Sequence, residues 1–198
     1  MLAAIILSAG ASSRMGRPKA LLPYRESTFL EHLIEAARHP RIGWTRVVLG
    51  AGGDEIRKHA HLDSSVVVLN PDWEQGQLSS ISAGLRSLEG IETEGIVLCP
   101  VDHPLVSANL VAELVDQFYR KQKAIVLPTY KGRRGHPVIF SSTLYGALLA
   151  APADKGARAV VWAHAANVLE VPTDEEGVVL NINDPDMLRH ALGPIEES

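Results

Sequence analysis

The stretch "AAIILSAGASSRMGRPK", residues 3–19, joins a short apolar run to a loop of small and basic residues. The run from Ala3 to Leu7 is typical of a buried strand, and the loop after it carries Arg14, Arg17 and Lys19. A turn of small residues behind such a strand lets backbone N–H groups face an anion, and the basic side chains add charge that can meet a triphosphate. By residue type alone, a phosphate site and a solvated basic loop fit this stretch equally well.

The loop matches neither of two widespread phosphate-binding patterns. The dinucleotide pattern G-x-G-x-x-G is absent, and the Walker pattern fails because Lys19 is followed by Ala20 instead of Ser or Thr. Pro18 restricts Arg17 to extended conformations, so no helix is expected to run through the loop up to the lysine.

Length and composition predict one ordinary globular domain over residues 1–198, with 46% hydrophobic and 21% charged residues. The net charge of −4 favours neither a nucleic-acid nor a membrane partner. The single cysteine, Cys99, lies in the apolar run "GIVLC" and is expected to be a buried, inert thiol. The N-terminal run is a poor secretory signal because no basic segment precedes it, and no run is long enough to cross a bilayer, so we expect a cytoplasmic protein.

Short runs of Val, Ile and Leu alternate with segments of helical period, which is typical of helices covering a mostly parallel sheet. Thr28 with Glu31 predicts a capping box, Ser107 predicts a second helix cap, and "TYKGRRGHPVIF" predicts a hairpin inserted into the same sheet. Strands are predicted at residues 3–7, 46–49, 65–69, 96–99, 124–127, 137–140 and 168–171, and helices at 29–39, 53–61, 79–88, 108–122, 157–164 and 186–192.

Three unusual loops follow predicted strands: residues 8–19, 70–76 and 100–104. In open sheets of this kind, ligands bind outside the carboxyl ends of the strands. We therefore expect the three loops to converge on one crevice.

The third loop, in "LCPVDHPLV", places Asp102 directly after a buried strand. A carboxylate there is costly unless a cation or hydrogen-bond donors satisfy it, although a cap for the following turn is an equally good explanation. His103 is expected to be a positioning or surface residue. His32, His39, His59, His61 and His190 lack metal-ligand spacing and are assigned no role.

The string "LSAGASSRMGRPK" resembles the signature loop of the MobA-like nucleotidyltransferases, which include the molybdenum cofactor guanylyl- and cytidylyltransferases. The family pattern runs Leu-Ala-Ala/Gly-Gly and then Ser, Arg, Met-Gly and Lys, and this chain departs from it at Ser8. The resemblance covers almost the whole chain. It implies an α/β fold with a three-layer, Rossmann-like, mostly parallel sheet, helices on both faces and a small β-hairpin insertion, as in the nucleotide-diphospho-sugar transferases (GT-A-like).

The resemblance also implies roles for the first two loops. Lys19 and Arg14 would be catalytic, with Arg14 at the phosphates and Lys19 neutralising charge at the α-phosphate. The segment "LNPDWEQGQLSSISAGL" resembles the family segment Asn-Pro-x-Trp-x-x-Gly-x-x-Ser-Ser, which closes over the nucleotide, although Ser79 or Ser80 would serve equally well as a helix cap. The implied nucleotide-binding residues are Leu7, Ser8, Ala9, Gly10, Arg14, Lys19, Gly76, Ser79 and Ser80.

A magnesium site is implied by the family pattern Pro-x-Asp-x-Pro, which places the Mg²⁺-binding aspartate at Asp102. The segment "LNINDPDML" resembles the family's Asp-Ile-Asp-Thr-Pro-Glu-Asp, which makes Asn183 the second ligand. The amide lowers the charge of the site, and Asp184 stays open as a rival ligand or as a cap for the last helix.

The acceptor side is implied by the match of His136 and Pro137 to a Gly-His/Glu-Pro-Val segment, and of Arg158 to an Asp-x-Gly-x-Arg element. Because Ala9 is typical of the pyrimidine branch, the resemblance implies transfer of CMP from CTP to a phosphorylated acceptor of the molybdopterin type, with release of pyrophosphate. A molybdenum hydroxylase would be a client. The alternatives are a sugar- or polyol-phosphate nucleotidyltransferase and a non-catalytic carrier of molybdenum cofactor.

Overall fold

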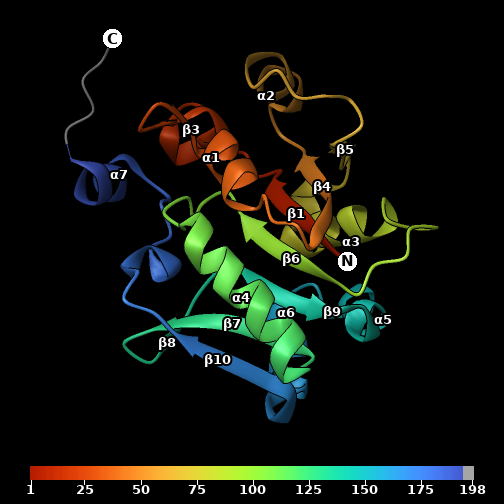
Figure 1. Cartoon of the computed structure of the whole chain (residues 1–198). Coiled ribbons are helices and arrows are strands. Elements are labelled where there is room, and N and C mark those ends of the chain that lie inside the picture. Colours follow the sequence, from red (N-terminus) through yellow and green to blue (C-terminus); the bar gives the residue numbers. More distant parts are fainter. Residues whose placement is uncertain (194–198) are drawn as a thin grey trace.

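A computed structural model describes residues 1–193, and within them eight strands form one sheet in the order β10-β7-β9-β6-β1-β4-β5, with β8 beside β7 (Figure 1). Neighbouring strands are parallel except at β9, which is antiparallel to both β6 and β7, and at β8, which is antiparallel to β7. The strands are β1 (Leu2–Ser8), β4 (Ile42–Leu49), β5 (Val67–Leu69), β6 (Gly95–Pro100), β7 (Ile125–Tyr130), β8 (Arg133–Arg134), β9 (Val138–Ser141) and β10 (Val168–Pro172). The mostly parallel sheet and the inserted hairpin are confirmed.

Helices cover both faces of this sheet and make the three layers that were expected (Figure 1). Helices α1 (Phe29–Ala36) and α4 (Ala108–Lys121) pack on one face, and α3 (Gln77–Arg86), α5 (Tyr145–Leu149) and α6 (Ala157–Ala163) on the other. Helices α2 (Gly53–His59) and α7 (Pro185–Leu192) add to the first layer. Because both faces are covered, all of β1 is buried, which explains its unbroken apolar sequence. None of the helices within residues 1–193 has the length and apolar character that crossing a bilayer requires.

The starts of α1 and α4 follow the predicted capping chemistry. The Thr28 side chain accepts from the Glu31 amide while the Glu31 carboxylate accepts from the Thr28 amide, which completes the capping box of α1. The Ser107 hydroxyl accepts from the Leu110 amide and caps α4 at 3.1 Å. These contacts satisfy amides that the helix itself leaves unpaired.

Several element boundaries differ from the prediction. Strand β4 begins at Ile42 rather than residue 46, because its first half is only partly buried and lacks a continuous apolar run. The sequence patterns missed β2 (Pro23–Tyr24), β3 (Ser27–Thr28), β8 and α5, all of which are too short to show a period. The domain expected over residues 1–198 includes residues 194–198, which lie outside the described part of the chain.

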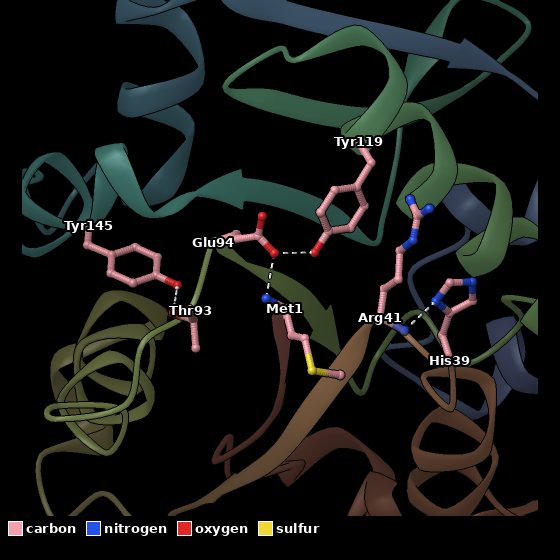
Figure 2. A network of polar contacts seen from close by, with 7 residues as sticks. All are labelled: Met1, His39, Arg41, Thr93, Glu94, Tyr119 and Tyr145. Carbon is pink, nitrogen blue, oxygen red and sulfur yellow. Dashed lines mark hydrogen bonds and ion pairs between the residues drawn. The ribbon is translucent and has the colours of Figure 1, made fainter.

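Polar contacts close the amino end of the sheet, where β1 begins (Figure 2). The Met1 ammonium donates to the Glu94 carboxylate at 2.5 Å, and the Tyr119 hydroxyl donates to the same oxygen at 2.8 Å. These two hydrogen bonds lower the pKa of Glu94. The Arg41 guanidinium lies 4.6 Å from the centre of the Tyr119 ring.

A segment near the C-terminus, residues 175–183 and here named the strap, crosses the opposite end of the sheet. The Ser107 amide donates to Glu175 at 3.1 Å, the His136 amide donates to the Val178 carbonyl at 2.9 Å, and the Ile182 amide donates to the Asp102 carbonyl at 2.7 Å. The strap therefore ties the loop after β6 to the loop before β9.

Candidate active site

A cavity of about 330 Å³ opens at the carboxyl ends of β1 and β6. All three loops that the sequence placed at strand ends contribute to it, so the predicted convergence is confirmed. Its lining consists of residues 7–12, 18–20, 56, 73, 74, 76, 77, 80 and 100–102.

The loop after β1 folds back on itself before it reaches Lys19. Ser12 and Gly16 have left-handed backbones with φ of 52° and 71°, and the Lys19 amide donates to the Ser12 hydroxyl at 3.1 Å. Only short 3-10 turns occur, at Ser13–Met15 and Lys19–Leu21, so the expected absence of a longer helix before Lys19 is confirmed. Arg14 is exposed and does not line the cavity.

Lys19 contacts a residue close to the C-terminus, Asn183. Its ammonium donates to the Asn183 side-chain oxygen at 2.5 Å. Burial lowers the pKa of Lys19, and the nearby charges of Asp102 and Asp184 oppose that shift. The loop after β1 thus meets the segment before α7 at one charged contact.

The two carboxylates near Lys19 are used differently. Asp102 lies half-buried on the cavity wall, and within residues 1–193 its side chain makes no ion pair. The Asp184 carboxylate accepts from the Met187 amide at 2.9 Å and caps α7, with Pro185 as the first helical residue. Asp184 is therefore engaged by its helix, whereas Asp102 faces the cavity.

Asp102 on the cavity wall and Asn183, which contacts Lys19 but does not line the cavity, are the side chains that would hold a divalent ion here. No group of three or more His, Cys, Asp or Glu side chains within the described residues is arranged to hold a metal. Asp102 and the Asn183 amide offer oxygen ligands only, and Mg²⁺ is commonly held by one or two carboxylates together with waters and substrate phosphates. A metal ion bound at Asn183 would compete with the Lys19 ammonium for the same side-chain oxygen, because the two cations repel each other.

Asn70 organises the second loop. It is buried at the end of β5, and its amide group donates to the hydroxyls of Ser79 and Ser80 at 2.9 and 3.0 Å. Helix α3 begins at Gln77 after Gly76, so the suggestion that Ser79 or Ser80 caps the helix is wrong. Ser80 lines the cavity and Ser79 does not, because the Ser79 hydroxyl donates back to the Gly76 carbonyl at 2.8 Å.

Trp73 and Ile56 line the cavity but were not assigned individual roles from the sequence, although Trp73 belongs to the segment that was expected to close over the nucleotide. Trp73 lies against Gly50, where an added Cβ would come within 2.6 Å of the Trp73 Cβ, and this close approach places Trp73 on the cavity wall. Ile56 comes from α2, whose sequence carries only an ordinary core pattern. Asn70 does not line the cavity, and the sequence predicted it only as the start of the loop at residues 70–76, not as the residue that holds the two serines.

The residues expected on the acceptor side do not line the cavity. His136 packs behind the wall against His103, with ring centres 4.7 Å apart and ring planes at 46°. Burial lowers the pKa of His136 to about 3, and the neighbouring His103 and Arg158 add to the shift. Arg158 is exposed on α6, and its guanidinium lies 5.9 Å from the Trp162 ring centre.

His103 is 9% exposed, so the surface role left open for it is wrong. Burial lowers its pKa, while the Asp102 charge and the Val178 carbonyl oppose that shift. Because His103 follows Asp102 and touches His136, it connects the cavity wall to His136.

A mostly parallel sheet with a small-residue loop and a lysine at its carboxyl edge is the arrangement that the sequence predicted for a nucleotidyltransferase. Residues 4–168 match the family described as the MobA-like NTP transferase domain, and the chain belongs to that family.

Two curated relatives and one solved structure match most of this chain. The molybdenum cofactor cytidylyltransferase of Escherichia coli is 27% identical over 92% of this chain and 91% of its own. The nicotine blue oxidoreductase of Paenarthrobacter nicotinovorans is 32% identical over 78% of each chain. The crystal structure of Rv0371C from Mycobacterium tuberculosis in complex with manganese superposes with a TM-score of 0.79 at 28% identity, covering 98% of this chain and 99% of that one.

Proposed function

We propose that the protein transfers CMP from CTP to a phosphorylated acceptor of the molybdopterin type, with Mg²⁺, and releases pyrophosphate. The observation that carries this proposal is the contact of Lys19 with Asn183 beside Asp102 on the cavity wall. A cation and two oxygen ligands thus meet where the triphosphate of a bound nucleotide would lie.

The cavity suits a nucleotide in size and lining. A volume of about 330 Å³ is at the lower end of the range for small-molecule sites. Leu7, Ser8, Ala9 and Gly10 would contact the base and ribose, and Gly76 and Ser80 would close the opposite side. Ser79 would act through Asn70, which holds both serines.

In the proposed reaction, an acceptor phosphate oxygen forms a bond to the α-phosphorus while the bond to the bridging oxygen of the β-phosphate breaks. The attacking oxygen is already anionic, so no strong general base is required, and catalysis rests on positioning and charge. Lys19 would neutralise charge at the α-phosphoryl group, and Arg14 would meet the departing pyrophosphate from the exposed rim. Asp102 and Asn183 would hold Mg²⁺, which supplies charge neutralisation at the triphosphate. The manganese complex of Rv0371C supports a divalent ion in this fold.

The choice of CTP rests on Ala9, whose methyl group stands at the cavity wall. The Escherichia coli relative, a cytidylyltransferase, supports the same choice. His136, Pro137 and Arg158 would form the acceptor side, separate from the nucleotide cavity. A molybdenum hydroxylase would receive the product.

Two alternatives use the same site differently. A sugar- or polyol-phosphate transferase would keep the nucleotide cavity and change only the acceptor, whereas a carrier protein would bind cofactor without turnover. One relative is named as an oxidoreductase, so similarity to named proteins does not fix the reaction. Turnover has to be measured for this chain.

The deciding experiment is a pyrophosphate-release screen of CTP, GTP, ATP and UTP with molybdenum cofactor and with a panel of sugar phosphates. We expect magnesium-dependent release with CTP and molybdenum cofactor. Release with a sugar phosphate alone would establish the first alternative, and binding without release for every combination would establish the carrier.

A further inference from the structure

Two histidine rings fill the space between the cavity wall and the acceptor side. The rings of His103 and His136 lie 4.7 Å apart at 46°, and the void beside them, which both line, is only about 10 Å³. A void of that size holds at most one water molecule. Each ring therefore limits the orientations open to the other.

The surroundings of the pair are fixed by the strap. The Val178 carbonyl accepts from the His136 amide at 2.9 Å, and an added Cβ at Gly135 would come within 2.4 Å of the same oxygen. At Gly177 an added Cβ would come within 2.1 Å of the Leu105 carbonyl. The backbone on both sides of the two rings is thus tightly held.

The two imidazole rings have fewer polar contacts than the backbone around them. The Nδ1 atoms of both His103 and His136 are buried without a hydrogen-bond partner within residues 1–193. Neither Nδ1 atom supplies a hydrogen bond that orients its ring, so the packing of the two rings against each other contributes to the orientation of His136. His103 is the side chain that provides this contact.

We propose that His103 is a positioning residue, which fixes the ring of His136 by direct contact and so couples the acceptor side to the loop that carries Asp102. The coupling to acceptor binding rests on the proposed role of His136. His103 itself does not line the nucleotide cavity and is not a catalytic residue.

Two variants of His103 distinguish the effect of its aromatic ring from the effect of its polar atoms. His103→Phe keeps an aromatic ring against His136, whereas His103→Asn keeps a polar group and removes the ring. His190→Gln, on the exposed face of α7, is the matched control. The first readout is the imidazole ¹⁵N and ¹H signals of His136 in the free protein at constant pH, and the second is the KM for molybdopterin compared with the KM for CTP.

We expect His103→Asn to shift the His136 signals and to raise the KM for molybdopterin about tenfold, because displacement of a positioned group by a fraction of an ångström has effects of this order. The KM for CTP should stay within about twofold, and His103→Phe should restore both readouts, since the rest of the site is unchanged. Unchanged His136 signals in His103→Asn would overturn the proposal, as would an equal rise in both KM values.

The free-protein signals decide the positioning role even if molybdopterin proves not to be the acceptor, so failure of the proposed function is distinguishable from failure of this inference. If His103→Asn does not fold, nuclear Overhauser contacts between the two rings in the unmodified protein take its place. Their absence would overturn the proposal, and so would His136 signals in His103→Phe that differ from those of the unmodified protein.

Discussion

The Lys19 ammonium donates a hydrogen bond to the Asn183 side-chain oxygen at 2.5 Å, across 164 positions of sequence. The oxygen that we propose as a metal ligand is therefore held by a cation in the free protein. Binding of Mg²⁺ to Asn183 would release the ammonium, which could then turn toward the α-phosphate. Metal binding and the placement of Lys19 would be linked by this exchange.

Replacement of Lys19 by alanine should lower kcat by about 10²- to 10³-fold, since removal of one group that stabilises transition-state charge costs this much. The fold should persist, because Lys19 lies on a surface 3-10 turn and is only partly buried. Pyrophosphate release measures the first effect and thermal unfolding the second. Lys131→Ala, at an exposed hairpin turn, is the control. Near-normal turnover of Lys19→Ala would contradict the assignment.

Replacement of Asn183 by aspartate should lower the Mg²⁺ concentration for half-maximal activity roughly tenfold, because a second carboxylate strengthens the site. Titration of activity with Mg²⁺ measures this. Asp184→Asn should leave that concentration within about twofold, since asparagine caps a helix as well as aspartate does. A large rise in that Mg²⁺ concentration in Asp184→Asn would instead make Asp184 the ligand.

Replacement of Ala9 by glycine should shift base preference from CTP toward GTP. Ala9 is buried at the cavity wall, and removal of its methyl group makes room for the larger base. A change of one methyl group in a pocket alters discrimination by about 10- to 200-fold at most. The ratio of kcat/KM for the two nucleotides is the measurement, and an unchanged ratio would show that Ala9 does not set base choice.

Replacement of Gly177 by alanine should lower the free energy of unfolding by about 3 kcal/mol, because a Cβ placed there meets the rigid Leu105 carbonyl at 2.1 Å. Chemical denaturation gives the value. Gly146→Ala is the matched control, since an added Cβ in α5 meets nothing within 4 Å. That variant should gain about 0.5–1 kcal/mol from reduced backbone entropy. Equal stabilities for the two variants would show that the strap can move away from Leu105.

Cys99 should resist thiol reagents until the protein unfolds. It is 3% exposed, and burial raises its pKa to about 12, so the reactive thiolate is scarce in the native state. The folded protein keeps the Cys99 thiol protonated up to a higher pH than the unfolded chain does. The contribution of this raised pKa to stability is therefore complete below pH 9.0 and is lost as the pH rises toward 12. Labelling with and without denaturant at pH 8 tests this, and rapid native labelling would contradict the burial.

Local sequence patterns account for most of the framework. The apolar run of β1, the Thr28–Glu31 capping box and the Ser107 cap are each specified within a few residues, and each is found in the structure. The short elements β2, β3, β8 and α5 were missed because a segment of two to five residues is too short to show the hydrophobic period of a strand or helix. The caps are predictable because they depend only on neighbours along the chain.

The sequence by itself determined that strands and helices alternate, that small-residue and acidic loops lie at strand ends, and that those loops share one edge of a parallel sheet. Only the tertiary structure decided that Lys19 meets Asn183, that Asp184 caps its helix, and that His136 lies against His103 behind the cavity. The physical reason is the placement of β9 antiparallel between β6 and β7 and the path of the strap across their ends. These contacts join residues far apart in the chain, and their distances depend on sheet order and packing, for which no local pattern exists.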